Sequence, residues 1–368
     1  MRRRGFRQSD KGHNIIKNVR RISFIDLSPI RGGAEVSIEK LFERMKGRED
    51  ITLFTSSESD AFRAEEKVQK IKIDERILLN KKNSLYAVYS FVKIAVTGIK
   101  TEMDFDIILT NTFKSHIFGL GQKIKNRKIK WIIFERDVPE NVFIKILKNF
   151  LYKESDFVIF NSNYLKSMSA KTERSEVIYN LIESDGKERE ERDFLKFAFM
   201  GNLTYEKGFD RTLEVFEKVR SKMPEAELFV SGEAGYGSEV KEKSGRNIVY
   251  FGYDKDKNCL NKSGFFILLN RKKESFSRAV AEAMMAGAIP VILKGNGMDE
   301  YADESNALIF EHYDAEKIAE GILNTIKAGK AEILSMNARK KINSILDFET
   351  TIFKFGALFD ELTKNPGP

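Results

Sequence analysis

Short apolar segments alternate with longer amphipathic ones in the first half of the chain. The apolar segments are rich in isoleucine, valine and phenylalanine, as buried parallel strands are. We expect strands at Ile22–Leu27, Ile51–Thr55, Ile107–Leu109, Trp131–Phe134 and Phe157–Phe160. Apolar residues in the segments between them recur about every 3.6 positions, which predicts crossover helices. These helices are expected at Ala34–Arg44, Tyr86–Ile99, Asn141–Tyr152 and Tyr164–Ala170.

The same alternation begins again in the second half. Further strands are expected at Leu195–Met200, Leu228–Ser231, Ile248–Phe251, Phe265–Leu269 and Ile289–Leu293. Helices are expected at Phe209–Lys222, Ser277–Ala286 and Ala315–Ala328. Strands that alternate with helices form parallel sheets, so the pattern predicts an α/β protein. We expect two Rossmann-like, doubly wound domains that face a cleft.

A nearly all-charged segment, Glu183–Asp193, separates the two patterns and has no apolar face to bury. We therefore expect an acceptor domain at residues 21–188 and a donor domain at residues 189–345. Residues 1–20 are expected to form a basic, disordered arm. Residues 346–368 are expected to form a C-terminal helix, near Glu349–Lys364, that packs back on the N-terminal domain.

Composition narrows the class of protein. In the 368 residues, 42% are hydrophobic and 32% are charged, which is typical of a globular protein. Cys259 is the only cysteine, so neither an intrachain disulfide nor a cysteine pair for zinc can form. No apolar run follows the basic N-terminus, which predicts a cytoplasmic location without a signal peptide or membrane span.

The net charge of +8 favours anionic partners, which include nucleotide diphosphates and anionic membranes. No nucleic-acid-binding motif accompanies this charge, so we expect no nucleic acid partner. The segment Asn141–Lys153 interleaves apolar residues with Lys145, Lys148 and Lys153. We favour packing of its apolar residues against the core, with contact to the inner face of an anionic membrane as the alternative.

The strongest local motif runs from Glu274 to Val291, follows an expected strand and opens an expected helix. A helix N-terminus presents free backbone N–H groups, so phosphates can be held near Phe276 and Ser277 without a metal. At roughly 1.5 Å per helical residue, Glu274 and Glu282 lie on the order of 10 Å apart. We expect them to bind different parts of one elongated ligand.

This motif resembles the retaining GT-B glycosyltransferases of family 4, also called glycosyl transferases group 1. In that family a Glu, seven further residues and a second Glu lead to a small apolar run that ends in Gly and Pro-Val. The segment Phe24–Glu35, with Gly32 and Gly33, resembles the family's first strand and glycine turn. The segment Gly201–Gly208 resembles the family element Gly-Arg-Leu-x-x-Glu-Lys-Gly.

The resemblance implies a role for each matching residue. Glu282 would accept hydrogen bonds from the ribose of the donor, and Glu274 would bind a hydroxyl of the transferred sugar. Lys207 would hold the diphosphate, so Lys207 and Glu274 are the expected catalytic residues. Gly32, Gly33, Asn202, Phe276, Ser277 and Arg278 would complete the donor site.

Two positions depart from the family pattern. Asn202 stands where an Arg is common, so the missing phosphate cation would come from Arg271, Lys272, Arg278 or Lys294. Many relatives carry a His after the strand that ends near Phe134, and none stands there in this chain. Glu135, Arg136 or Asp137 would take over its place near the sugar or the acceptor. We expect His116 to be a surface residue.

The resemblance implies transfer of a sugar from a UDP- or GDP-sugar to an unidentified acceptor. A cell-envelope polysaccharide or lipid-linked sugar is the preferred acceptor, because the basic surface and the segment Asn141–Lys153 would both favour work beside an anionic membrane. Neither a cofactor nor a metal is expected. The sequence leaves two alternatives open, a catalytically silent nucleotide-sugar binding protein and a nucleotide-sugar epimerase on the GT-B scaffold. It does not indicate the oligomeric state.

Overall fold

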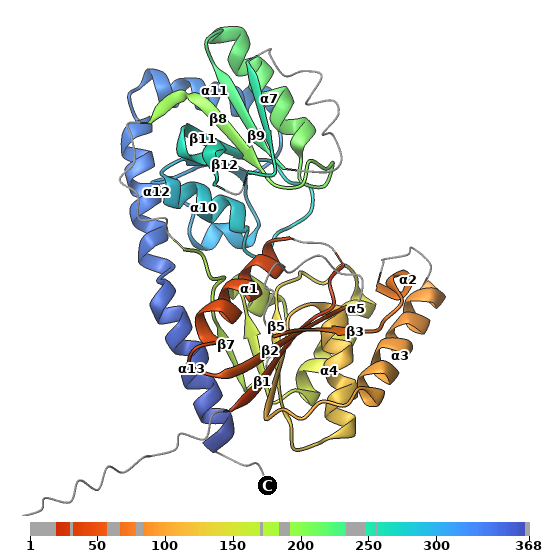
Figure 1. Ribbon diagram of the computed structural model, residues 1–368. Helices are drawn as coiled ribbons and strands as arrows, with labels where there is room; N and C mark the ends of the chain where they lie inside the picture. Colours follow the sequence, from red (N-terminus) through yellow and green to blue (C-terminus); the bar gives the residue numbers. More distant parts are fainter. Residues whose placement is uncertain are drawn as a thin grey trace, which may run out of the picture.

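The computed structural model describes residues 20–29, 32–56, 67–78, 84–169, 172–183, 192–232, 247–254 and 256–364. These residues form two domains, each built on a parallel sheet and stacked one above the other in Figure 1. Residues 1–19 of the predicted basic arm lie outside the described residues. Most of the predicted linker, with the predicted boundary between residues 188 and 189, also lies outside them.

The N-terminal domain contains a seven-stranded sheet in the order β3-β2-β1-β4-β5-β6-β7. Its strands are β1 (Arg21–Asp26), β2 (Asp50–Ser56), β3 (Val68–Ile71), β4 (Ile107–Thr110), β5 (Lys130–Glu135), β6 (Phe157–Phe160) and β7 (Ser175–Val177). The strand order reverses between β1 and β4. In open parallel sheets, ligands bind outside the carboxyl ends of the strands at such a reversal.

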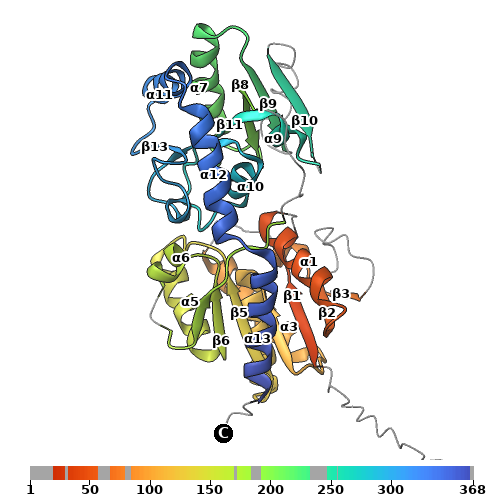
Figure 2. The ribbon, with the colours of Figure 1, turned by 90° about the vertical axis from the view of Figure 1, so that its left-hand side faces the viewer.

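Helices cover both faces of this sheet. They are α1 (Gly33–Met45), α2 (Glu75–Leu78), α3 (Ser84–Lys100), α4 (Phe113–Lys125), α5 (Val142–Glu154) and α6 (Asn163–Met168). Residues of α4 and α5 share one hydrophobic cluster with α3, whereas α1 and the C-terminal helix α13 (Phe348–Lys364) share another. Figures 1 and 2 show α13 running down the N-terminal domain. Its Phe355 ring lies 5.6 Å from the ring of Phe134.

The C-terminal domain contains a six-stranded sheet in the order β10-β9-β8-β11-β12-β13. Its strands are β8 (Asp193–Met200), β9 (Glu227–Ser231), β10 (Ile248–Gly252), β11 (Ser263–Leu268), β12 (Ile289–Leu293) and β13 (Leu308–Phe310). Its helices are α7 (Phe209–Lys222), α9 (Asn258–Asn261), α10 (Arg278–Ala286), α11 (Ala315–Lys327), α12 (Ala331–Ile345) and the 3-10 helix η1 (Gly297–Glu300). The predicted pair of doubly wound parallel-sheet domains is confirmed.

The two domains touch through polar contacts between loops that follow strands. Asn161, after β6, donates to Ser275 Oγ over 2.9 Å. Tyr179 donates to the carboxylate of Glu300 over 2.9 Å. The carboxyl edges of the two sheets therefore face each other, which is the geometry that a shared ligand site requires.

His116 differs from its prediction as a surface residue. It is fully buried in α4, which packs against α3, and its Nδ1 lies 2.9 Å from Thr110 Oγ1. Burial lowers the pKa of His116 to about 4, so the ring is neutral at physiological pH. The prediction failed because His116 lies on the side of α4 that faces the sheet, with Thr110 of β4 on one side of its ring and Glu135 of β5 3.9 Å from its Nε2, and the local sequence does not indicate this orientation.

The helix α5 follows the favoured prediction only in part, since Leu151 and Tyr152 pack in a core cluster but other apolar residues do not. Its buried side consists of Lys148, Leu151 and Tyr152. The buried Lys148 Nζ lies 2.9 Å from Glu135 Oε1, which compensates its charge. Four apolar side chains point outward instead: Val142, Phe143, Ile146 and Phe150 are 73%, 56%, 64% and 47% exposed.

Candidate functional site

Glu274 lies in the loop between β11 and α10, and neighbouring polar groups hold it in place. Its backbone N–H donates to Asn296 Oδ1 over 2.9 Å, and its carbonyl accepts from the Gly297 N–H over 2.9 Å. A Cβ at Gly297 would lie 1.7 Å from the carbonyl oxygen of Ser275, so the loop needs glycine there. The Glu274 carboxylate forms an ion pair with Lys207.

Lys207 reaches Glu274 because Gly208 allows the chain to turn tightly against β11. Gly208 has a φ of +68°, and a Cβ there would lie 2.0 Å from the carbonyl oxygen of Leu269. The backbone N–H groups of Arg271 and Lys272 bond to the carbonyl of Glu206. The loop after β8 is thus fixed to the loop that carries Glu274.

The N-terminus of α10 adds backbone donors to the same site. Ser277 has a φ of +57°, a strained value for a residue other than glycine, and Tyr301 donates to its carbonyl over 3.0 Å. The Phe276 ring is buried between Tyr179 and Tyr301, at 5.8 and 5.3 Å. Phe276 therefore offers a ligand its backbone alone, beside the positive end of the α10 dipole.

Glu282, one turn further into α10 than Arg278, is 8% exposed. Its Oε1 lies 2.8 Å from Arg278 Nε and 3.1 Å from Lys257 Nζ. Burial opposes its ionisation, but the charges of Arg278 and Lys257 outweigh burial and hold the pKa of Glu282 below its ordinary value. Both of these contacts are to Oε1, and a carboxylate has further acceptor capacity for a hydroxyl of a ligand.

The glycine turn of the N-terminal domain lies across from α10. A Cβ at Gly33 would lie 3.6 Å from both Cβ and Cδ of Arg278, and Arg278 Nη1 donates to Ser37 Oγ of α1 over 3.0 Å. The Gly32 N–H donates to Glu35 Oε2 over 2.8 Å, which caps α1. The N-termini of α1 and α10 therefore meet at the cleft, where both favour an anion.

A buried polar cluster lies beside this turn, at the reversal between β1 and β4. Burial and the neighbouring Glu35 raise the pKa of Asp26 to about 7, although Asn111 donates to its carboxylate. Burial lowers the pKa of Arg136 to about 9, which leaves it cationic at neutral pH. Arg136 Nη1 donates to Asn180 over 2.9 Å, and no partner is seen for its Nε and Nη2 among the described residues.

The structure separates the three residues expected to replace the family's His. Glu135 is fully buried and accepts from Lys148, over 2.9 Å, and from Tyr152, over 2.7 Å. Burial would raise the pKa of Glu135, but the Lys148 ammonium outweighs it and holds this pKa at about 2. Glu135 therefore cannot contact a sugar as proposed. Asp137 is exposed, and Arg136 is the member of the three that faces the carboxylates of the cleft.

Asn202 is exposed in the loop that carries Lys207. Of the four cations expected to compensate for it, three are paired elsewhere, Arg271 with Asp210, Lys272 with Glu140 and Lys294 with Glu311. Arg278 lies beside Gly33, as described above. The structure therefore brings Arg278 and Glu282 to the glycine turn, and it brings Lys207 to Glu274.

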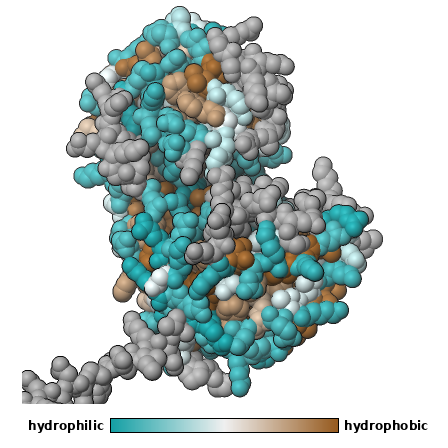
Figure 3. Space-filling model, in the orientation of Figure 1, coloured by the Kyte–Doolittle hydropathy of each residue, from teal (hydrophilic) through white to brown (hydrophobic). Residues whose placement is uncertain are grey.

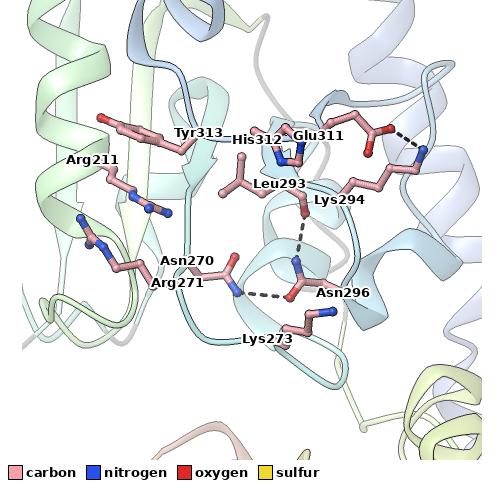
Figure 4. Close-up of a pocket in the computed structure, with 10 residues that line it drawn as sticks. All are labelled: Arg211, Asn270, Arg271, Lys273, Leu293, Lys294, Asn296, Glu311, His312 and Tyr313. Carbon is pink, nitrogen blue, oxygen red and sulfur yellow. Dashed lines mark hydrogen bonds and ion pairs between the residues drawn. The ribbon is translucent and has the colours of Figure 1, made fainter.

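An open cavity of about 280 Å³ lies in the C-terminal domain, and the chain just before Glu274 contributes Asn270, Arg271 and Lys273 to its lining (Figure 4). Arg211, Lys273 and Lys294 line it, and Asn270 at its base donates to Asn296 Oδ1 over 3.4 Å. The same oxygen holds the backbone of Glu274. The sequence motifs did not indicate Asn270 or Asn296, whose role is to fix this loop.

Two family models match consecutive parts of the chain. The model of "Glycosyltransferase Family 4" matches residues 31–185, and the model of "Glycosyl transferases group 1" matches residues 182–341. Together they cover both domains and the cleft between them. The chain belongs to the family 4 glycosyltransferases. Members of this family use nucleotide sugars and retain the anomeric configuration of the transferred sugar.

Solved structures share the fold of this glycosyltransferase. HepE of Anabaena, solved in complex with UDP-glucose, has a TM-score of 0.72 and 16% identity, and the match covers 93% of this chain and 100% of HepE. Sucrose-phosphate synthase of Thermosynechococcus elongatus has a TM-score of 0.73 and 16% identity, over 94% of this chain and 99% of that one. These likenesses confirm the GT-B fold.

A sequence relative of this glycosyltransferase is an uncharacterized 42.6 kDa protein in the cps region of Klebsiella pneumoniae. The two proteins are 26% identical over an alignment of 314 residues, and the match covers 73% of this chain and 83% of the relative. Among the residues that the structure describes, no group of three or more His, Cys, Asp or Glu side chains is placed to hold a metal ion. No helix in the described part of the glycosyltransferase is long and apolar enough to cross a membrane.

Proposed function

We propose that this glycosyltransferase transfers the sugar of a UDP-sugar to a cell-envelope polysaccharide or to a lipid-linked precursor of one. The UDP-glucose complex of HepE, which has the same fold, supports a UDP-sugar donor. The relative in the cps region of Klebsiella pneumoniae supports an envelope polysaccharide as the acceptor.

The observation that carries the proposal is the arrangement of two carboxylate–cation pairs around two facing helix N-termini. Glu274 with Lys207 and Glu282 with Arg278 lie on one wall of the cleft, and the glycine turn lies on the other. A diphosphate between the walls meets backbone N–H groups and cations, and the carboxylates meet hydroxyls at its two ends. Glu282 binds the ribose, and Glu274 binds the sugar.

Catalysis in this proposal is mainly electrostatic. The bond between the anomeric carbon and the diphosphate oxygen breaks, and the acceptor oxygen bonds to that carbon on the same face. The acceptor proton passes to the departing diphosphate. Negative charge grows on the diphosphate as the bond breaks, so Lys207 and the backbone donors near Ser277 stabilise the transition state more than the ground state.

Arg136 provides a positive charge from the N-terminal wall in this scheme. Two of its guanidinium nitrogens have no partner among the described residues, although the side chain is only 6% exposed. Buried donors of this kind are usually satisfied, so a ligand oxygen is a fitting partner for them. Arg136 would then bind a hydroxyl or phosphate oxygen near the place where many relatives carry a His.

The test is a screen of UDP- and GDP-sugars with the purified protein, alone and with envelope glycolipid extracts. We expect UDP release that increases when the acceptor is present, and a product with the anomeric configuration of the donor. Conversion of the donor without any acceptor would instead indicate an epimerase. Nucleotide binding without turnover of any donor would indicate a silent binding protein.

A further inference from the structure

One side of the N-terminal domain exposes an unusual number of large apolar side chains. Of the 17 large hydrophobic residues that are exposed in the described structure, 10 lie on α3, α4 and α5. They are Val88, Tyr89, Val92, Val96, Ile99, Ile124, Val142, Phe143, Ile146 and Phe150. We call the outer surface of these three helices the α3–α5 face. Figure 3 shows hydrophobic residues in brown on the lower domain, on the side where α3 lies in Figure 1.

The helix α3 cannot turn its apolar stripe inward. Its exposed apolar residues recur three or four positions apart, from Val88 and Val92 to Val96 and Ile99, so they form one stripe along the helix. The opposite side packs closely on α4. A Cβ at Gly98 would lie 2.4 Å from the carbonyl oxygen of Phe118, and one at Gly121 would lie 2.2 Å from that of Ala95.

The helix α5 is fixed in a similar way. Its inner side is held by the ion pair between Lys148 and Glu135, and Tyr152 donates to the same carboxylate over 2.7 Å. Rotation of α5 that buried Phe143 and Ile146 would break this buried network, which is costly in a protein interior. The apolar side chains of both helices are therefore held toward the outside.

The charges between these apolar residues are almost all positive. The segments of α3, α4 and α5 contain eight lysines, and their only acidic residue is Glu154. Five of these lysines are exposed, Lys93, Lys100, Lys125, Lys145 and Lys153, and Lys125 is paired with Glu102 just after α3. A surface of apolar residues among lysines matches the interface of an anionic bilayer, where acyl chains meet negative headgroups.

The same charges argue against a second copy of the chain as the occupant. Two α3–α5 faces placed together would bring like charges into contact, and like charges across an interface disfavour association. We propose that the α3–α5 face docks the protein peripherally on an anionic lipid bilayer, with the exposed apolar residues of α3 and α5 inserted at headgroup level. This inference goes beyond the transfer reaction and does not depend on it.

The test uses the full chain and sedimentation with vesicles, without any nucleotide or acceptor. One set of vesicles contains roughly equal amounts of phosphatidylglycerol and phosphatidylcholine, and the other contains phosphatidylcholine alone. We expect binding to the anionic vesicles and little binding to the neutral ones. The double variant Phe143→Asp/Ile146→Asp should bind the anionic vesicles at least about tenfold more weakly, because it places charge at headgroup level.

A matched control carries the same charge change on the other domain. Ile333 and Met336 on α12 are 58% and 66% exposed, so Ile333→Asp/Met336→Asp should leave vesicle binding close to that of the original protein. Circular dichroism and UDP binding of both variants check that they fold. If both variants lost vesicle binding equally, binding would depend on the net charge of the protein and not on the α3–α5 face, and the proposal would be overturned.

Two further results would also overturn it. One is an original protein that does not sediment with anionic vesicles. The other is a dimer, seen by analytical ultracentrifugation, that ignores vesicles and that Phe143→Asp/Ile146→Asp dissociates, because the α3–α5 face would then join two copies of the chain. A failure of vesicle binding in a protein that still turns over donor would leave the proposed transfer intact.

Discussion

At the scale of single residues, Glu274 and Glu282 are both paired with cations but lie in different surroundings. Glu282 is nearly buried between Arg278 and Lys257, whereas Glu274 is held on a loop beside Lys207. If Glu282 binds the ribose, Glu282→Ala should weaken UDP binding by roughly 10-fold to 100-fold, the range for a hydrogen bond to a charged group. Glu274→Ala should bind UDP almost normally and lower turnover by about 100-fold, since the sugar would be misplaced.

Calorimetric titration with UDP and steady-state turnover distinguish these effects. Glu316→Ala provides the control, since this exposed carboxylate pairs with Lys218 on the outer surface of the C-terminal domain. The control should match the original protein in both assays. Small and equal effects of Glu274→Ala and Glu282→Ala would contradict the assignment of the two carboxylates.

The cations at the phosphate position lead to a second prediction. If the diphosphate binds as proposed, Lys207 and the N-terminus of α10 provide the positive charge that a metal ion would otherwise supply. Treatment with EDTA should therefore leave turnover nearly unchanged. Loss of most activity in EDTA, with recovery on addition of manganese or magnesium, would show that the proposed electrostatic mechanism is incomplete.

Asp26 should make the stability of the protein depend on pH. Burial raises its pKa from 3.8 to about 7, so between these values the folded protein keeps a proton that the unfolded chain releases. The free energy of unfolding should therefore fall as pH rises, at about 1.4 kcal/mol per pH unit and by on the order of 4 kcal/mol at most. Above about pH 7 the contribution of Asp26 to the free energy of unfolding no longer changes with pH.

Asp26→Asn should remove most of this dependence of the unfolding free energy on pH. At alkaline pH the variant should therefore lose less stability than the original protein. The variant is tolerable because the Asn111 side-chain oxygen has no partner among the described residues and can accept a bond after the amide rotates. Urea unfolding at several pH values measures the effect, with Asp104→Asn as an exposed control. Parallel pH profiles for the original protein and Asp26→Asn would show that Asp26 is already ionised when folded.

At the scale of elements, the turn that starts α7 depends on a glycine for two separate reasons. Gly208 and Gly329 have similar φ values, +68° and +64°, but a Cβ at Gly329 would meet nothing within 4 Å. Gly329→Ala should cost about 1 kcal/mol for the left-handed backbone alone. Gly208→Ala should cost clearly more, because its Cβ would lie 2.0 Å from a carbonyl oxygen.

Denaturant unfolding of both variants gives the two free energies. The difference between them measures the clash of the turn with the end of β11. Gly208→Ala should also reduce turnover, because the displaced turn would move Lys207 away from Glu274. If the two substitutions cost the same free energy, the close approach of Gly208 to Leu269 would not be a constraint in the folded protein.

The sequence predicted those elements whose own residues form a clear apolar pattern. The central strands β4, β5 and β11 contain continuous apolar runs buried on both faces, and such runs are visible in the sequence. The short edge strands were not predicted. For example, β7 has the sequence SEV and β3 the sequence VQKI, and neither contains an apolar run.

The positions that sequence reasoning missed are those that depend on a neighbour distant in the chain. The helix α5 has two apolar sides, and periodicity alone cannot say which of them faces the sheet. Glu135 and Arg136 are adjacent in sequence but lie on opposite sides of the strand end, since successive residues of a strand point in opposite directions. The motifs at Gly201–Gly208 and Glu274–Val291, by contrast, were recognisable because the residues of each motif are close together in the sequence.

At the scale of the whole molecule, the site exists only where the domains meet. Arg278 donates to Ser37 and to the carbonyl of Leu181, over 3.0 and 2.6 Å, and Glu300 accepts from Tyr179. The helix α13 joins the two domains a second time, because it follows the C-terminal domain in sequence and packs in the N-terminal one. Small changes in the angle between the domains therefore change the distance between the two walls of the donor site.

Gly33 offers a direct test of domain closure. Its Cβ position faces Arg278 at 3.6 Å, so Gly33→Trp should wedge the domains apart without disturbing either core. We expect UDP to compact the original protein in small-angle scattering, through hinge closure, and to leave Gly33→Trp expanded. The variant should still bind UDP through the C-terminal domain, but turnover should fall by about 100-fold because the N-terminal donors no longer reach the diphosphate.

Gly47→Trp, where a Cβ meets nothing within 4 Å, is the matched control and should behave like the original protein. Full turnover in a Gly33→Trp variant that does not compact would show that the reaction needs no closure.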